Sequence, residues 1–211
     1  MARPVNADAK KTRERLLCAA AALFSDRGER ATTLREVADA ADVTMATIHH
    51  YFGNKESLYA ACLESVRDDF APFGLMLEEI FGRLEAESFT DDDPGRVLDR
   101  LVRGGFRYAR NHRSGLQLIM RSVVDTGELD RKWRDRMLIP FLDRCSATLA
   151  PRLPISAGEV RLHLQSLIAL GMRYALSSPP ELASFFGAKK PVAAAEDHLV
   201  STARLLLVRN G

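Results

Sequence analysis

Every long periodic segment of the chain repeats its apolar residues at the spacing of an α-helix. The first segment, residues 11–26, places four apolar side chains on one face: Leu16, Ala20, Leu23 and Phe24. Gly28 follows, where a glycine commonly ends a helix. The pattern therefore predicts an all-α protein that opens with a helix.

Residues 33–59 predict two short helices joined by a tight turn. Thr33 and Glu36 have the spacing of a capping box, in which the two side chains bind free backbone N–H groups at a helix start. Asp42 lies where the chain must turn sharply, and aspartate tolerates a left-handed backbone better than most residues. The turn separates an apolar stripe on the first helix from the start of the second.

The second short helix is predicted to begin after Thr44, which is suited to cap it. Its Ile48 and Phe52 are four residues apart and face inward. A third helix opens with Asn54 as its cap and Lys55 in its first turn, where a lysine is unfavourable unless a phosphate docks there. The arrangement suits insertion of the second helix into the major groove of DNA.

Three segments, LLCAAAALFSDRG, ATTLREVADAADVT and IHHYFGNKESLY, resemble in order and spacing the DNA-binding domain of the TetR family of bacterial transcriptional regulators. The resemblance covers residues 11–59, and it departs from the family pattern twice. Asp42 stands where the family has glycine, and His49 stands where it most often has tyrosine. The resemblance implies residues 1–54 as a DNA-binding domain and residues 55–211 as an effector-binding and dimerisation domain.

The resemblance also implies which residues contact DNA. The candidates are Thr33, Thr44, Met45, Thr47, His49, His50, Tyr51 and Lys55. We assign Thr33, Thr44, His50 and Lys55 to phosphates, and Met45, Thr47 and His49 to base edges.

The rest of the chain predicts further helices. They cover residues 55–84, from the acidic loop 90–95 to residue 111, residues 114–124, 129–150 with a bend at Pro140, about 156–176 after a capping box at Ser156 and Glu159, and about 193–209. The last two carry dense apolar stripes that fit either a monomer core or a homodimer interface, and the family dimerises through its last two helices. The candidate interface residues are Leu164, Leu167, Ile168, Gly171, Ala175, Leu199, Ala203, Leu206 and Leu207.

If the family pattern holds, a small-molecule pocket lies among the middle helices. The candidate ligand contacts are Phe106, Tyr108, His112, Gln117, Arg121, Trp133, His163 and Tyr174. Each also has a structural interpretation. Arg121 could bind an anionic effector or pair with Asp125 one turn on, Trp133 could be a packing residue, and His163 could be an interface histidine.

Composition adds little to this picture. The chain of 211 residues has 30 basic and 28 acidic residues, and the excess lies in residues 1–55, which contain nine basic and seven acidic residues. Basic residues near the start form either a DNA-contacting arm or a solvated tail. Three widely spaced cysteines favour buried free thiols in a reducing cytoplasm over redox sensing. No apolar run predicts a membrane span, and no signal peptide is evident, so we expect a cytoplasmic protein.

The function predicted from these observations is a homodimeric repressor that binds a palindromic DNA operator and is released by a small molecule. An activator, or a DNA-binding module controlled by a protein partner, remains open. An enzyme is disfavoured, because the sequence has no GxSxG, Walker, HExxH or CxxC motif. We therefore expect no catalytic residue, metal site or cofactor.

Overall fold

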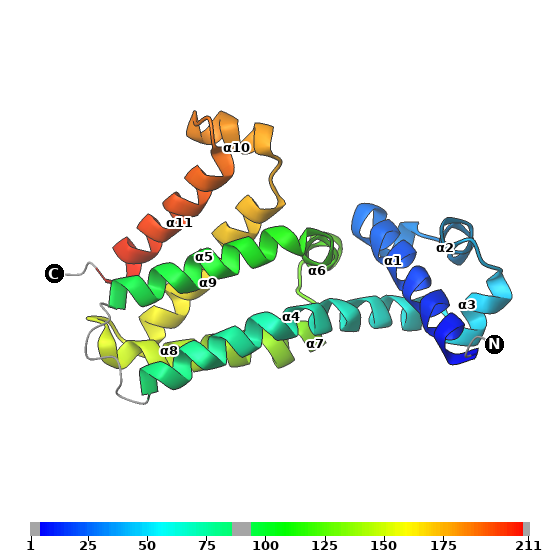
Figure 1. The fold of residues 1–211 in the computed structure, drawn as a ribbon, viewed down its shortest axis with the longest axis horizontal. Coiled ribbons are helices and arrows are strands. Elements are labelled where there is room, and N and C mark those ends of the chain that lie inside the picture. The colour runs from blue at the N-terminus through cyan, green and yellow to red at the C-terminus, as the bar shows by residue number, and fades with distance from the viewer. Residues whose placement is uncertain (1–4, 86–93, 209–211) are drawn as a thin grey trace. The chain divides into compact units, whose positions relative to one another are not determined.

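The computed structural model describes residues 5–85 and 94–208, which form helices and no strand. The all-α prediction is therefore confirmed. The helices are α1 (Val5–Ala31), α2 (Leu34–Ala41), α3 (Met45–Phe52), α4 (Lys55–Glu85), α5 (Pro94–Asn111), α6 (Arg113–Thr126), α7 (Arg131–Trp133), a π-helix (Arg134–Leu138), α8 (Ile139–Leu149), a 3-10 turn (Ala150–Arg152), α9 (Ala157–Leu176), α10 (Pro179–Phe186) and α11 (Pro191–Leu207) (Figure 1).

Helices α4 and α9 follow the sequence prediction closely. The assignment of α4 continues without a break through Pro72. At the start of α9 the capping box of Ser156 and Glu159 is formed as expected, with both reciprocal hydrogen bonds. Of the predicted acidic loop, residues 90–93 lie outside the described residues, and α5 begins at Pro94.

Two features differ from the sequence prediction. The predicted helix 129–150 is interrupted by the π-helix, which ends two residues before Pro140. A proline removes one backbone donor and clashes with the preceding turn, and a wider π turn accommodates this locally. The sequence analysis also missed α10, which Ser178 caps and Pro179 opens.

The chain divides into two compact units. The first unit comprises Met1–Phe70 and Ser114–Trp133, and the second comprises Ala71–Arg113 and Arg134–Gly211. This division differs from the boundary at residue 54 because Leu118 and Ile119 of α6 are fully buried in one core with residues of α1, α2, α3 and the first part of α4. The other core residues of the first unit are Leu16, Ala20, Phe24, Val37, Ala38, Ala41, Ile48, Phe52, Leu58, Cys62, Leu63 and Val66.

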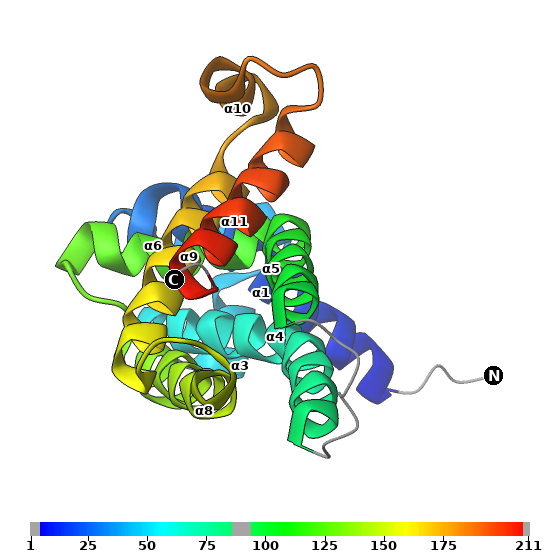
Figure 2. The ribbon, with the colours of Figure 1, turned by 90° about the vertical axis from the view of Figure 1, so that its left-hand side faces the viewer.

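In the second unit, α5, α9 and α11 lie side by side (Figure 1, Figure 2). Their shared core includes Val97 of α5, Val160 of α9 and Ala203 of α11, all with at most 1% exposure. Helix α10 packs on α11 and lies at its N-terminal end (Figure 2). Among the described residues, no helix is long and apolar enough to cross a membrane.

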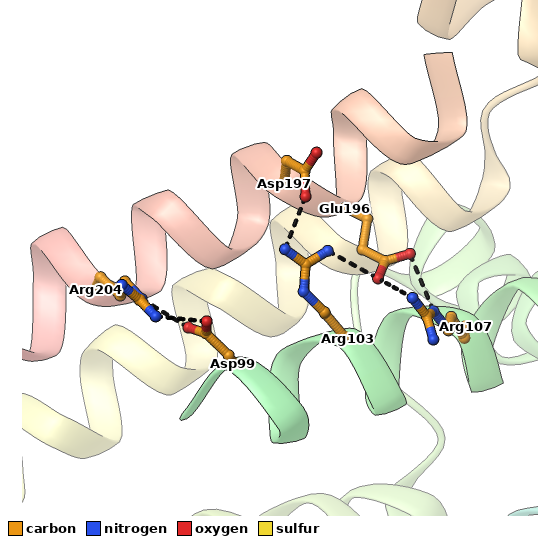
Figure 3. Close-up of polar contacts among 6 residues, drawn as sticks. All are labelled: Asp99, Arg103, Arg107, Glu196, Asp197 and Arg204. Atoms are coloured by element: carbon orange, nitrogen blue, oxygen red, sulfur yellow. Dashed lines mark hydrogen bonds and ion pairs between the residues drawn. The ribbon is translucent and has the colours of Figure 1, made fainter. Parts of the chain in front are cut away.

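A ladder of ion pairs joins α5 to α11 (Figure 3). Glu196 of α11, only 7% exposed, accepts hydrogen bonds from Arg103 at 3.0 Å and from Arg107 at 2.7 and 3.2 Å. Arg103 also donates to Asp197 at 2.7 Å, which together with Glu196 raises the pKa of Arg103. We call these three contacts and the Asp99–Arg204 pair the α5–α11 ladder.

Candidate functional site

Helices α2 and α3 are fixed by local hydrogen bonds of the kind that the sequence predicts. The Thr33 hydroxyl accepts from the Glu36 backbone N–H at 3.3 Å, and the Glu36 carboxylate accepts from the Thr33 backbone N–H at 2.8 Å. These bonds from Thr33, with a smaller contribution from Arg27, hold the pKa of Glu36 below its ordinary value. The α2 start is therefore capped while its carboxylate stays ionised.

The turn between α2 and α3 has the predicted geometry. Asp42 has φ 51° and ψ 56°. Among the described residues, it is the only residue other than glycine that has a positive φ. Its N–H bonds the carbonyls of Ala38 and Asp39, and the N–H of the next residue, Val43, also bonds Ala38. A left-handed residue reverses the chain within one step, which lets α3 start at once after Thr44.

Helix α3 has one buried face and one exposed face. Ile48 and Phe52 are 0% and 9% exposed and lock the helix to the core. Met45 and His49 are exposed on the other face, together with Ala46, which the sequence analysis did not select. Its small side chain carries no polar signal, so only its position on the exposed face identifies it.

The polar residues of α3 are held by contacts within the helix. Thr44 caps the helix by accepting from the Thr47 backbone N–H at 3.2 Å, and the two hydroxyls are 2.9 Å apart. His49 Nδ1 lies 2.6 Å from the carbonyl oxygen of Gly53. His50 is exposed, and the ring of the half-buried Tyr51 lies edge-on to it at 5.2 Å. The exposed surface of α3 is thus presented in a defined arrangement.

The start of α4 lies beside the start of α2. Asn54 caps α4 as predicted, accepting from the Ser57 N–H at 2.8 Å. Lys55 Nζ donates to the carbonyl oxygen of Thr32 at 3.3 Å, and Thr32 directly precedes the cap Thr33. The exposed Arg35 of α2, which the sequence analysis also missed, adds a further positive charge to this surface.

The candidate ligand contacts do not form one cluster. In the second unit, Phe106 is 4% exposed and belongs to the core. Tyr108 stacks between Phe73 and His112, whereas Tyr174 packs on Phe186 at 5.4 Å. His163, on α9, has a buried Nδ1 for which no hydrogen-bond partner is found among the described residues.

The first unit contains Gln117, Arg121 and Trp133. Gln117 is exposed. Arg121 pairs with Asp125 at 3.0 Å and donates to the carbonyls of Asp26 and Arg27, so its structural interpretation is confirmed. Trp133 lies in the wall of a half-open cavity of about 330 Å³. The cavity is lined by Tyr59, Ala60, Leu63, Glu64, Arg67, Asp130, Arg131, Lys132 and Trp133.

Some of the nine candidate dimer-interface residues belong to the hydrophobic core of the single chain. Five of the nine are at most 8% exposed within a single chain, namely Leu167, Ala175, Leu199, Ala203 and Leu207. Because they already pack against their own chain, they belong to its hydrophobic core. The large apolar side chains that remain exposed on α9 and α11 are Leu162 (64%) and Leu205 (57%).

Comparison with known proteins places this site in a family. Residues 16–62 match the model of "Bacterial regulatory proteins, tetR family". The transcriptional repressor KstR2 of Rhodococcus jostii (strain RHA1) is 40% identical over 76 residues, which are 36% of this chain and 36% of that protein. KstR2 of Mycolicibacterium smegmatis is 36% identical over 101 residues, 48% of this chain and 44% of the relative. The matches thus span less than half the length of these relatives.

Solved structures extend the likeness to the whole fold. A TetR-like transcriptional regulator from Rhodococcus sp. RHA1 has a TM-score of 0.57 at 22% identity and covers 98% of both chains. NalD, the secondary repressor of the MexAB-OprM multidrug efflux pump in Pseudomonas aeruginosa, has a TM-score of 0.58 at 23% identity, over 97% of this chain and 99% of that one. By the sequence of residues 16–62, the chain carries a helix-turn-helix of the tetR family of bacterial regulatory proteins, and its whole fold is similar to that of solved TetR-like regulators.

Proposed function

We propose that this protein is a transcriptional repressor that reads a DNA operator with α3. The observation that carries the proposal is the division of α3 into a face locked by Ile48 and Phe52 and a face that exposes Met45 and His49. A helix anchored in this way can enter the major groove without losing its own packing. The relatives that match over this region carry the name of repressors.

Contacts to phosphates are proposed for Thr33, Thr44, His50 and Lys55. Thr33 and Thr44 stand at the N-termini of α2 and α3, where backbone N–H groups and the helix dipole favour an anion. Lys55 brings a positive charge next to Thr33 through its bond to Thr32. Contacts to base edges are proposed for Met45, Thr47 and His49, with Tyr51 beside them.

The repressor is proposed to act as a homodimer on a palindromic operator. Dimerisation is typical of the family, and the exposed Leu162 and Leu205 give α9 and α11 apolar surface for it. Two recognition helices then read half-sites about 34–36 Å apart. Changing Leu205 to Glu is expected to give a monomer by light scattering after gel filtration, and a variant that stays dimeric would exclude an α11 interface.

Release by a small molecule completes the proposal. A ligand shifts the balance between DNA-bound and free conformers only by its different affinity for the two. The proposed ligand contacts are taken from the sequence-predicted set, of which Trp133 lines the cavity of the first unit.

The experiment that tests DNA binding uses the purified chain and a pool of random duplexes. Repeated selection is expected to enrich a palindrome, and a pool that stays random would refute operator recognition. Lys55→Ala should weaken binding to all sequences and lower the salt slope by about one, whereas His49→Ala should cost about 1–3 kcal/mol and relax one base preference. Lys189→Ala, which removes an exposed lysine in the second unit, is the matched control and should leave the operator affinity and the salt slope unchanged.

A further inference from the structure

The cavity of the first unit is built entirely from two short segments. One is the first half of α4, and the other is the residues that lead into and form α7. Its volume of about 330 Å³ is at the lower end of the range for small-molecule sites, which is roughly 300–1,000 Å³. It therefore suits a compact ligand rather than an extended chain.

The walls of this cavity combine flat apolar surfaces with positive charge. Tyr59 and Trp133 supply aromatic rings, and Leu63 supplies an aliphatic surface. Rings of this kind favour a planar aromatic ligand, which they contact by stacking or edge-on. A planar body is thus the shape that the walls select.

Charge decides the polar group of that ligand. Three basic residues line the cavity against two acidic ones. One of the acidic residues, Asp130, already accepts the Trp133 backbone N–H at 2.9 Å as a cap. Arg67 has a distant partner in its neighbour Asp68, at 3.7 Å, with the side chain of Asp68 77% exposed. A ligand carboxylate in the cavity could replace Asp68 as the partner of Arg67 and bind its guanidinium at closer range through two hydrogen bonds.

The cavity is also connected to the helix-turn-helix core. The ring of Tyr59 lies edge-on to Phe24 of α1 at 5.2 Å. Burial of the Tyr59 phenol raises its pKa to about 12, so this wall stays uncharged. The ring of Trp133 lies edge-on to Phe70 of α4, also at 5.2 Å. A ligand between Tyr59 and Trp133 therefore touches side chains that pack against the helices presenting α3.

We propose that this cavity is a binding site for a planar aromatic anion, held between Tyr59 and Trp133 with its carboxylate on Arg67. The site belongs to the unit that contains the helix-turn-helix. Only the description of this ligand as an effector of operator binding rests on the proposed function.

The test uses Trp133 as its own reporter, because it is the single tryptophan in the chain. Its indole N–H resonance is followed in the ¹⁵N-labelled full-length protein, without DNA, during titration with 2-naphthoate. The neutral 2-naphthamide and the cationic 2-naphthamidine have nearly the same shape and isolate the effect of charge. A saturable shift with 2-naphthoate, at an affinity about tenfold or more above that of the amide, is expected for a charge-assisted contact. Equal affinity for the three probes, or no shift, would overturn the proposal.

Variants locate the site. Arg67→Gln should lower the affinity for 2-naphthoate about tenfold and leave 2-naphthamide unchanged, because only the charge-assisted contact is lost. Arg30→Gln, which removes an exposed charge on α1, should have no effect. Trp133→Phe is followed by calorimetry and should weaken both probes. An Arg67→Gln protein of unchanged circular dichroism that still binds 2-naphthoate fully would place the ligand elsewhere.

The two proposals fail separately. Operator affinity is measured with and without 2-naphthoate on the duplex selected above. If the protein binds a probe but selects no operator, the binding site in the cavity is supported and the repressor function is refuted. If it binds an operator but none of the three probes, the repressor function is supported and the binding site is refuted. Probe binding that leaves operator affinity unchanged would remove the effector role.

Discussion

Substitution of the buried Glu196 tests how much the α5–α11 ladder stabilises the protein. Its side chain is 9% exposed, while those of its partners Arg103 and Arg107 are 35% and 67% exposed. Removing one partner of a fully buried ion pair costs about 3–5 kcal/mol. Because water still reaches both arginines and screens them, we expect Glu196→Gln to cost less, about 2 kcal/mol.

Asp99→Asn is the matched control within the same ladder. Its pair with Arg204 has side-chain exposures of 24% and 45%, so the expected loss is about 0.5–1 kcal/mol. Urea unfolding is followed by far-ultraviolet circular dichroism, since Trp133 belongs to the first unit and does not report on α11. Protein concentration is held constant because the proposed dimer would make the measured stability depend on it.

The expected result is a fall in the urea midpoint of roughly 0.7–1 M for Glu196→Gln, with an unchanged m value, and a fall of about a quarter to a half of that size for Asp99→Asn. High salt should reduce the loss of stability caused by Asp99→Asn more than the loss caused by Glu196→Gln, because the carboxylate of Asp99 is more exposed than that of Glu196. If the two substitutions cost the same, burial of Glu196 does not set the strength of the ladder, and the reasoning is refuted.

Three further predictions concern the first unit and the thiols. Gly28→Ala should cost about 2–3 kcal/mol, measured by chemical denaturation, because Gly28 has φ 83° and ψ 165° and an added Cβ would lie 2.5 Å from an Asp125 oxygen; an unchanged midpoint would contradict it. Because the pKa of Glu36 is lowered in the folded protein, Glu36 contributes stability that is present above its unfolded pKa and is lost as the pH falls through its lower folded pKa. Glu36→Gln should therefore lose less stability than the original protein below pH 4.5. Parallel pH profiles of the free energy of unfolding for the two proteins would argue against this. With a chromogenic disulfide at pH 8, Cys18 should react in the native protein, whereas Cys62 and Cys145, whose pKa values burial raises to about 12, should react only after unfolding; three fast thiols would disprove it.

Local features of the fold were predictable because their causes lie within a few residues. The capping boxes at Thr33 and Ser156, and the left-handed Asp42, depend on side chains and backbone at most three or four positions apart. The same reasoning applied to Ser178 and Glu181 would have found α10, since the hydroxyl of Ser178 accepts from the Glu181 N–H. That helix was missed although its signal was present.

Long-range features were not predictable in this way. Arg103 and Glu196 are 93 positions apart, and nothing in either neighbourhood specifies that they meet. The same limit applies to Leu199, whose apolar stripe fits a monomer core and a dimer interface equally well until the structure shows that Leu199 is only 2% exposed within its own chain. Arg121 shows a mixed case, since its pair with Asp125 follows from helical spacing but its bonds to α1 do not.

The contact between His49 and Gly53 has a consequence for the base contact that we propose for His49. A carbonyl oxygen only accepts hydrogen bonds, so the ring nitrogen 2.6 Å away, Nδ1, has to carry the proton. In the neutral imidazole the other nitrogen, Nε2, is then an acceptor. In the major groove an acceptor pairs with the exocyclic amino groups of adenine or cytosine and is repelled by guanine N7 and O6. If His49 reads a base as proposed, a single backbone contact at the end of α3 thereby sets which bases it favours.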